Sequence, residues 1–339
     1  MSTIKDVANL AGVSVSTVSI ILNGKAADRK ISADTQQKVL ESVKTLNYRP
    51  NVSAKKLRSS TNKEFSVAVY WASDYRTHFL ARLITGIQAE VLKYDCPINI
   101  VICPYKNGLL HAEKGLLNAT FDAAIIANTS HEDMAHLNAA PPKIPFVLYN
   151  RESEQYNTVT IDNFAAGRKA ARLFIEHGLT NIAMVLSKTP YLAMSARSQG
   201  FIETCQASGA PIQAENILVA TDNSIQGGAL AAEQLLQLPA RPQAVFCDSD
   251  ALAQGMLYTL YQHDIRLPED LSLIAMGMGN PEANRYSIPA LTVVEVPIET
   301  IASECIRVLM EVLEHRVEPP VHIQFDSTLI IRETCRAPL

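Results

Sequence analysis

Apolar residues recur at helical spacing in three short stretches within the first 50 positions of the chain. These stretches precede Gly12, follow Ser14 and follow Ser32, and the i, i+3, i+4 spacing in each predicts an amphipathic helix. Ser14 and Ser32 suit the starts of the second and third helices, and Gly12 suits a tight turn between the first two. Two helices joined by so short a turn form a helix-turn-helix. The pattern therefore predicts a small all-α domain with one shared core.

From Phe65 onward the pattern changes to short apolar runs separated by longer helical stretches. The runs are FSVAVYW, INIVIC, AAIIAN, PFVLYN, NIAMVL, AVFC and LSLIAMG. Continuous apolar runs of this length are typical of parallel strands that are buried on both faces, and their alternation with helices predicts doubly wound α/β sheets. Ligands of such sheets bind beyond the carboxyl ends of the strands, often between two lobes.

The net charge changes sign at the same place as the pattern. Residues 1–63 hold eleven Lys and Arg against four Asp and Glu, a net charge of +7, whereas residues 64–339 carry a net charge of −11. The overall charge of −4 conceals this asymmetry. Because basic side chains that neutralise DNA phosphates release condensed counterions, the basic end favours a nucleic-acid partner.

The second predicted helix carries the candidate DNA-reading residues. In a helix-turn-helix the N-terminal part of this helix enters the major groove. Its positions outside the expected core are Val15, Ser16, Thr17, Ser19 and Ile20. The hydroxyl groups can bond base edges or phosphates, whereas the two aliphatic side chains can make only apolar contacts, for instance with a thymine methyl group. The alternative is that these residues merely cover the surface of a small helical domain.

Residues 51–58, NVSAKKLR, have the composition of a helix but span only about two turns, which is too short to persist alone. We expect this segment to be disordered until DNA is bound. Once it folds there, Lys55, Lys56 and Arg58 would meet phosphates, and Leu57 would offer an apolar wedge for a minor-groove step. The alternative is a solvated linker with one incidental leucine.

The remaining motifs argue against a metal site, a cofactor or catalytic residues. His131-Glu132 and His136 miss the H-E-x-x-H spacing, and residues 277–279 lack the third glycine of a dinucleotide site. The sequence contains neither a P-loop nor a G-x-S-x-G elbow. The six cysteines form no C-x-x-C pair, and the chain has neither a signal-peptide pattern nor an apolar stretch of ~20 residues. We therefore expect a cytoplasmic protein with reduced thiols and no membrane partner.

Several stretches resemble the lactose-repressor/galactose-repressor (LacI/GalR) family, and together they cover essentially the whole chain. TIKDVANLAGVSVSTVSIILNG is similar to the family's helix-turn-helix signature, and NYRPNVSAKKLR is similar to its hinge helix. RSQGF, CDSDALAQGML, LPEDLSLIAMG, PALTVVEVP and IIRETC are similar to segments of its effector domain. The resemblance implies a dimeric transcription regulator that binds double-stranded, pseudo-palindromic operator DNA. It also implies an effector domain with two lobes and three crossover strands, like the periplasmic sugar-binding proteins.

The resemblance implies limits for each domain as well. They are a helix-turn-helix DNA-binding domain at 1–50, a hinge helix and linker at 51–63, and an effector-binding and dimerisation domain at 64–339. Within the last, lobe 1 covers about 64–163 and 294–324, and lobe 2 covers about 164–293 and 325–339. The chain stops soon after Cys335, without the heptad tail that would make a tetramer, so we expect a homodimer.

The predicted binding residues form two sets. The resemblance implies Val15, Ser16, Ile20 and Leu57 for DNA and Phe79, Arg197, Ser249 and Asp250 for the effector, and the other members come from the helix and loop positions themselves. The DNA-binding set is Ser14, Val15, Ser16, Thr17, Ser19, Ile20, Asn23, Arg29, Asn51, Ala54, Lys55, Leu57 and Arg58. The effector-binding set is Tyr75, Phe79, Asn150, Arg197, Asp222, Ser249 and Asp250. Leu57 matches the leucine that wedges into the operator's central step, and Arg197 matches the effector-contacting arginine. For Asp250 the alternative is helix capping.

Three departures from the family pattern limit what the resemblance implies. Gly277 stands where many members carry an aspartate for the ligand. The connection at 25–30 is longer than usual, and its Arg29-Lys30 pair adds candidate phosphate contacts. Ile20 replaces a polar or basic residue that is common at that position.

Together these features predict a sequence-specific DNA-binding repressor that is controlled by a small-molecule effector. The loops after the apolar runs, at 72–79, 128–130, 150–151, 187–197 and 248–250, are rich in hydroxyl, amide and aromatic groups. That mixture suits a neutral polar ligand such as a sugar or a sugar derivative. Two other classes are weighed against this one: a solute-binding protein with a basic appendage, and an enzyme on a doubly wound sheet.

Overall fold

The computed structural model describes residues 4–22, 26, 29, 31–46, 64–72, 77–113, 116, 120–188 and 192–335. The chain divides into two compact units, Met1–Lys63 and Glu64–Leu339. Within the described residues, no helix combines the length and the apolar character needed to cross a membrane.

The first unit contains the three predicted helices: α1 (Ile4–Ala11), α2 (Val15–Leu22) and α3 (Ala33–Thr45). Ser14 Oγ accepts a hydrogen bond from the backbone N–H of Thr17 (3.1 Å), and Ser32 Oγ accepts one from Thr35 (3.3 Å), so both predicted caps are confirmed. Gly12 has a φ of 65°, which allows α1 to end in a tight turn. The shared core consists of Val7, Ala8, Ala11, Val18, Ile21, Ala26 and Val39.

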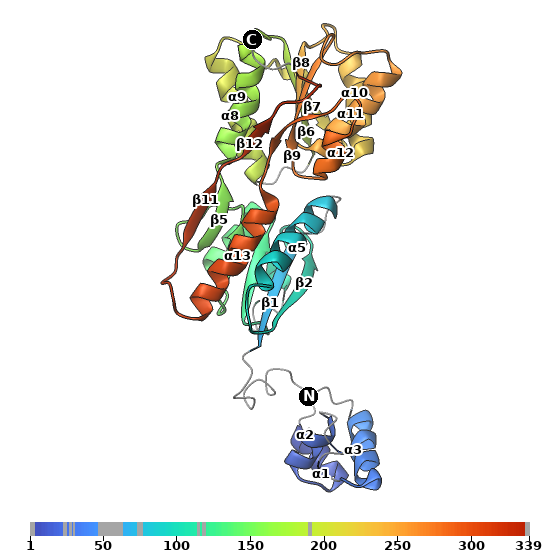
Figure 1. The fold of residues 1–339 in the computed structure, drawn as a ribbon, viewed down its shortest axis with the longest axis vertical. Helices are drawn as coiled ribbons and strands as arrows, with labels where there is room; N and C mark the ends of the chain where they lie inside the picture. The colour runs from blue at the N-terminus through green and yellow to red at the C-terminus, as the bar shows by residue number, and fades with distance from the viewer. Residues whose placement is uncertain are drawn as a thin grey trace. The chain divides into compact units, whose positions relative to one another are not determined.

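The second unit contains two six-stranded sheets, one in each lobe (Figure 1). The first sheet has the order β11-β5-β4-β3-β1-β2, and all of its strands are parallel. Its strands are β1 (Phe65–Ala72), β2 (Ile98–Tyr105), β3 (Ala123–Ala127), β4 (Phe146–Tyr149), β5 (Asn157–Ile161) and β11 (His322–Phe325). The helices of this lobe are α5 (Thr77–Val91), α7 (His131–Ala139), α13 (Ile298–Leu313) and a 3₁₀ turn, η1 (Leu110–Ala112).

The second sheet has the order β12-β10-β9-β8-β6-β7, in which only β12 runs antiparallel to its neighbour. Its strands are β6 (Ile182–Ser187), β7 (Ile217–Ala220), β8 (Ala244–Cys247), β9 (Ser272–Gly277), β10 (Thr292–Glu295) and β12 (Thr328–Ile330). The helices of this lobe are α8 (Asn163–Glu176), α9 (Leu192–Ala207), α10 (Ile225–Leu236), α11 (Asp250–Gln262), α12 (Pro281–Arg285) and the 3₁₀ turn η2 (Ala214–Asn216).

Every apolar run named above forms a strand, and all of these strands except β2 are buried on both faces; β2 is an edge strand whose Asn99 and Val101 are exposed. In β1, Val67 and Val69 belong to the core on one face, while Ala68 and Tyr70 belong to the core on the other. This is the arrangement of a doubly wound parallel sheet, because side chains alternate between the two faces. The predicted fold class is therefore confirmed: a helix-turn-helix unit and a two-lobed α/β unit.

The chain passes between the two lobes three times, from β5 to α8, from β10 to α13 and from β11 to β12. These passages bring the carboxyl ends of strands from both sheets to the region between the lobes. The sequence limits of the lobes stay a prediction.

Candidate functional site

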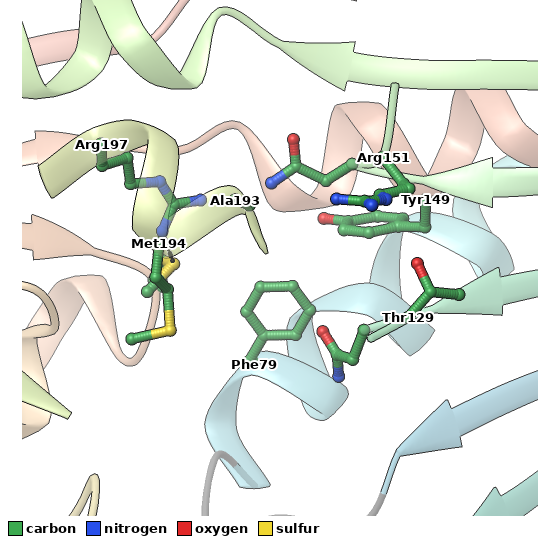
Figure 2. A pocket seen from close by; sticks show the side chains of 10 residues that line it. Phe79, Thr129, Tyr149, Arg151, Ala193, Met194 and Arg197 are labelled. Carbon is green, nitrogen blue, oxygen red and sulfur yellow. Dashed lines mark hydrogen bonds between the residues drawn. The ribbon is translucent and has the colours of Figure 1, made fainter. Parts of the chain in front are cut away.

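A cavity lies between the two lobes, beyond the carboxyl ends of their strands (Figure 2). The first lobe lines it with Phe79 of α5, Tyr149 of β4, and the loop residues Asn128, Thr129, Asn150 and Arg151. The second lobe contributes Ala193, Met194 and Arg197 of α9, and Met278, which follows β9. The cavity measures about 30 Å³, which is roughly twice the space that one water molecule needs. A metabolite therefore enters only when the lobes separate or lining side chains move.

Arg197 is the most deeply buried charged side chain of this cavity, with 2% of its surface exposed. Its Nε donates to Asn163 Oδ1 (2.9 Å), and its Nη1 lies 2.9 Å from Met278 Sδ. Asn163 in turn donates from Nδ2 to Asn150 Oδ1 (3.0 Å). The two asparagines therefore connect the end of β4 in the first lobe to the arginine in the second.

The first lobe places three polar side chains at the cavity with buried atoms that have no hydrogen-bond partner among the described residues. These atoms are Asn128 Nδ2, Thr129 Oγ1 and Arg151 Nε. Asn128 has a φ of 60°, a left-handed backbone conformation that asparagine tolerates at the end of β3. Burial lowers the pKa of the Arg151 guanidinium, and the neighbouring Glu152 offsets only part of that effect.

Aromatic rings form the apolar wall of the cavity. Phe79 lies with its ring centroid 5.2 Å from Trp71 and 5.7 Å from Tyr149. The Tyr149 hydroxyl donates to the carbonyl of Ile298 (3.4 Å), which ties β4 to the start of α13. These contacts hold Phe79 in one orientation at the floor of the cavity.

The structure brings three of the predicted effector-binding residues to this cavity: Phe79, Asn150 and Arg197. Tyr75 lies outside the described residues. The other three, Asp222, Ser249 and Asp250, are not among the lining residues, and their assignment to the effector stays a prediction.

The polar groups of Asp222, Ser249 and Asp250 accept hydrogen bonds from loops and from the start of a helix in the second lobe. Asp222 Oδ1 accepts from the backbone N–H of Ser224 (3.1 Å), and Ser249 Oγ caps α11 by accepting from Leu252 (3.3 Å). Asp250 is 4% exposed and accepts from the backbone N–H of Gly279 (2.8 Å) and from Asn284 Nδ2 (2.7 Å). Capping of α11 therefore falls to Ser249 rather than to Asp250.

The predicted effector-binding set lacked the cavity residues Asn128, Thr129, Arg151, Met194 and Met278, although the first three lie in the loops at 128–130 and 150–151 named from the sequence. A usable signal was present, because Asn128, Thr129 and Arg151 directly follow apolar runs that form neighbouring strands. Nothing in the local pattern marks Met194 and Met278, because an apolar residue after a strand or in a helix is also typical of the core.

A second group of polar side chains joins the lobes around Arg82 of α5. Its guanidinium binds Glu299 of α13 through two hydrogen bonds (2.6 and 2.7 Å) and contacts Glu295 of β10 (2.8 Å). Burial raises the pKa of Glu299, but the hydrogen bond and charge of Arg82 outweigh burial, so its pKa is lowered. Burial dominates at Glu295 and at nearby Asp250, and the pKa of each is raised.

The predicted DNA-reading residues lie on and before α2. Of the described residues in the predicted DNA-binding set, three are exposed: Ser14, Ser16 and the more distant Arg29. The other four are half-buried: Val15, Thr17, Ser19 and Ile20. Val15 packs against the core of the unit, which differs from the prediction that it lies outside that core. The Ser14 hydroxyl lies 2.7 Å from that of Ser16 and 2.9 Å from that of Thr17, so the three form one polar cluster at the start of the helix.

The other predicted DNA contacts lie outside the described residues: Asn23, Asn51, Ala54, Lys55, Leu57 and Arg58. Among the described residues, no group of three or more His, Cys, Asp or Glu side chains is arranged to hold a metal ion.

Comparison with known proteins agrees with this two-part architecture. Residues 3–51 match the profile of "Bacterial regulatory proteins, lacI family", and residues 171–335 match that of "Periplasmic binding protein-like domain". The HTH-type transcriptional repressor PurR of Photobacterium profundum is 27% identical to this chain, over 99% of both proteins.

Solved structures show the same likeness. A LacI family transcription regulator from Clostridium acetobutylicum is 39% identical, with a TM-score of 0.76 over 80% of this chain and 100% of that one. The lac repressor dimer bound to operator and the anti-inducer ONPF has a TM-score of 0.72 over 99% of each chain. At 20% identity, the latter likeness shows the fold alone. The relatives are regulators rather than enzymes, and this chain belongs to the LacI family of bacterial transcription regulators.

Proposed function

We propose that this protein is a transcriptional repressor that binds operator DNA as a homodimer and responds to a small-molecule effector held between its lobes. The observation that carries the proposal is the hydroxyl cluster of Ser14, Ser16 and Thr17 at the start of α2. This cluster lies on the N-terminal part of the second helix of a helix-turn-helix, which is the part that enters the major groove. The Photobacterium relative is named a transcriptional repressor, which supports repression rather than activation of transcription.

The positive charge of the first 63 residues supports DNA as the partner. Its Lys and Arg side chains would neutralise phosphates and position the unit, whereas α2 would read base edges. A two-fold dimer would present two such helices to the two halves of a pseudo-palindromic operator. The segment at 51–58 lies outside the described residues, and its folding on DNA is proposed from its sequence.

The cavity between the lobes supports control by a ligand. Because its 30 Å³ is too small for a metabolite, ligand binding is coupled to separation of the lobes or to movement of the lining side chains. A ligand that binds one arrangement of the lobes better than another shifts the population toward it. Such a shift would change the spacing of the two reading helices and hence the affinity for the operator. A sugar or a sugar derivative is the proposed effector, since the amide, hydroxyl and aromatic groups at the cavity suit polyhydroxylated rings.

Selection from a random duplex library, followed by fluorescence anisotropy with the full-length protein, tests the proposal. We expect a pseudo-palindromic consensus bound in preference to scrambled duplex, with an affinity that falls steeply between about 50 and 200 mM salt. Ligand binding without any sequence-preferring DNA binding would instead favour a solute-binding protein and would contradict the repressor function.

A further inference from the structure

We infer that the effector carries an oxyanion, either a phosphate or a carboxylate group, which Arg151 binds together with Asn128 and Thr129. The inference deepens the proposed function and depends on it for the identity of this cavity as the effector site. It names a class of ligand that differs from the neutral sugar suggested by the composition of the loops.

The first argument is that hydrogen-bond donors converge on the cavity. The buried atoms Asn128 Nδ2, Thr129 Oγ1 and Arg151 Nε have no partner among the described residues. The amide and guanidinium nitrogens can only donate, and a hydroxyl group donates as well. A buried donor without a partner is destabilising, so a ligand that supplies acceptor oxygens regains that free energy. Phosphate and carboxylate groups offer several acceptor oxygens to one such cluster.

The second argument is the charge of the cavity lining. Its described residues include two guanidinium groups, those of Arg151 and Arg197, and none of them is acidic. In Figure 2 the two guanidinium groups extend toward each other from opposite sides of the cavity. Glu152, next to Arg151 in the chain, is exposed to solvent rather than placed in the lining. Burial of the Arg151 guanidinium is costly, and an anionic ligand beside it would offset that cost.

The third argument is that the donors are positioned by the fold rather than by flexible ends. Asn128 and Thr129 follow β3, and Arg151 follows β4, and these strands are adjacent and parallel in the first sheet. Their carboxyl ends therefore present the three side chains to one place. A neutral sugar could accept some of the hydrogen bonds, but it would bring no negative charge to the Arg151 guanidinium.

Matched ligand pairs test the inference on the full-length protein. We would measure thermal shifts, and then Kd by calorimetry, for glucose, glucose 6-phosphate and gluconate, for ribose and ribose 5-phosphate, and for the neutral nucleobases adenine and hypoxanthine. We expect stabilisation by at least one phosphorylated or acidic member and little by its neutral parent. Comparison of the sugar phosphates with gluconate distinguishes a phosphate group from a carboxylate group as the bound oxyanion.

Arg151→Gln provides the decisive variant, and Arg172→Gln is the matched control, because Arg172 is an exposed arginine of α8 outside the cavity. We expect Arg151→Gln to weaken binding of the anionic ligand by at least about tenfold, Arg151→Lys to retain part of it, and Arg172→Gln to leave it unchanged. Unaltered operator binding by ligand-free Arg151→Gln would show that this variant is folded.

Equal binding of a neutral sugar and its phosphate would overturn the inference. So would stabilisation by a nucleobase alone, no stabilisation by any anion, or anion binding that Arg151→Gln leaves intact. Failure of the protein to bind DNA would contradict the proposed function but not the anion site, so the two failures are distinguishable.

Discussion

The carboxylate of Glu295 occupies the space that a side chain on Gly277 would need. A Cβ atom built on Gly277 would overlap Glu295 Oε2 and lie 3.1 Å from Val293 Cγ2. Gly277 ends β9, Glu295 ends the neighbouring parallel strand β10, and the two residues are paired in register. Many members of the family carry an aspartate at the position of Gly277, whereas here the carboxylate at this place comes from the adjacent strand.

Gly277→Asp should destabilise the protein by about 2–4 kcal/mol, because the new side chain overpacks the strand pair and adds a like charge beside Glu295. Urea denaturation gives the change in the free energy of unfolding. Glu295→Ala in the same background should recover part of the loss by vacating the space. A Gly277→Asp variant as stable as the wild type would show that Glu295 moves aside freely.

Arg82→Gln should destabilise the effector unit by about 2–4 kcal/mol, since it leaves Glu295 and Glu299 without their cation. The Arg82 side chain is only 12% exposed, so water replaces its contacts poorly. Arg266→Gln serves as the control, because Arg266 pairs with Asp270 at the surface and its loss should change stability little. Equal denaturation midpoints for the two variants would refute a structural role for the Arg82 cluster.

Asp250→Asn should change the pH dependence of stability. Burial raises the pKa of Asp250 despite the hydrogen bonds from Asn284 and Gly279, so the folded protein holds this proton more tightly than the unfolded chain. Its contribution to stability is therefore complete below the ordinary aspartate pKa of about 3.9 and is lost as the pH rises through the raised value. We expect the wild type to lose stability relative to the variant as the pH rises from about 4 toward 7.

Urea denaturation of the wild type and of Asp250→Asn at several pH values measures this difference. The titration of the other carboxyl groups affects both proteins equally, so it largely cancels in the comparison. A difference that stays constant with pH would mean that Asp250 does not titrate differently in the two states.

Ser16→Ala and Arg29→Gln should impair DNA binding in different ways. Ser16 is exposed on α2, so its loss should weaken binding to the selected operator by about 1–3 kcal/mol and relax the base preference at one position in each half-site. Arg29 is exposed in the turn before α3, and its loss should weaken binding to all sequences and reduce the salt slope by about one. Anisotropy against operator and single-base variants separates the two effects. A Ser16→Ala variant with the wild-type preference at every base would remove Ser16 from the reading set.

Much of the fold was predictable, because buried positions recur along the chain with the period of a helix or a strand. The caps at Ser14 and Ser32 and the apolar runs identify the helices of the first unit and most of the parallel strands. The strand β5 was missed, since its residues Asn157, Thr158 and Thr160 are polar yet buried. Their polar groups are satisfied by neighbouring strands, as when Asn157 Nδ2 donates to the carbonyl of Phe146 (2.9 Å). No local pattern can encode such a partner.

The location of the site was predictable from the sequence, but only some of the residues that line it were. Carboxyl ends of parallel strands meet at one edge, so the sequence by itself indicated where Phe79, Asn150 and Arg197 would gather. Only the tertiary structure decided that the Asp250 carboxylate binds Gly279 and Asn284, while Arg151 keeps a donor unpaired at the cavity. Hydrophobic periodicity reports which positions leave water, whereas the partner of each buried polar atom depends on residues that are distant in the chain and adjacent only after folding.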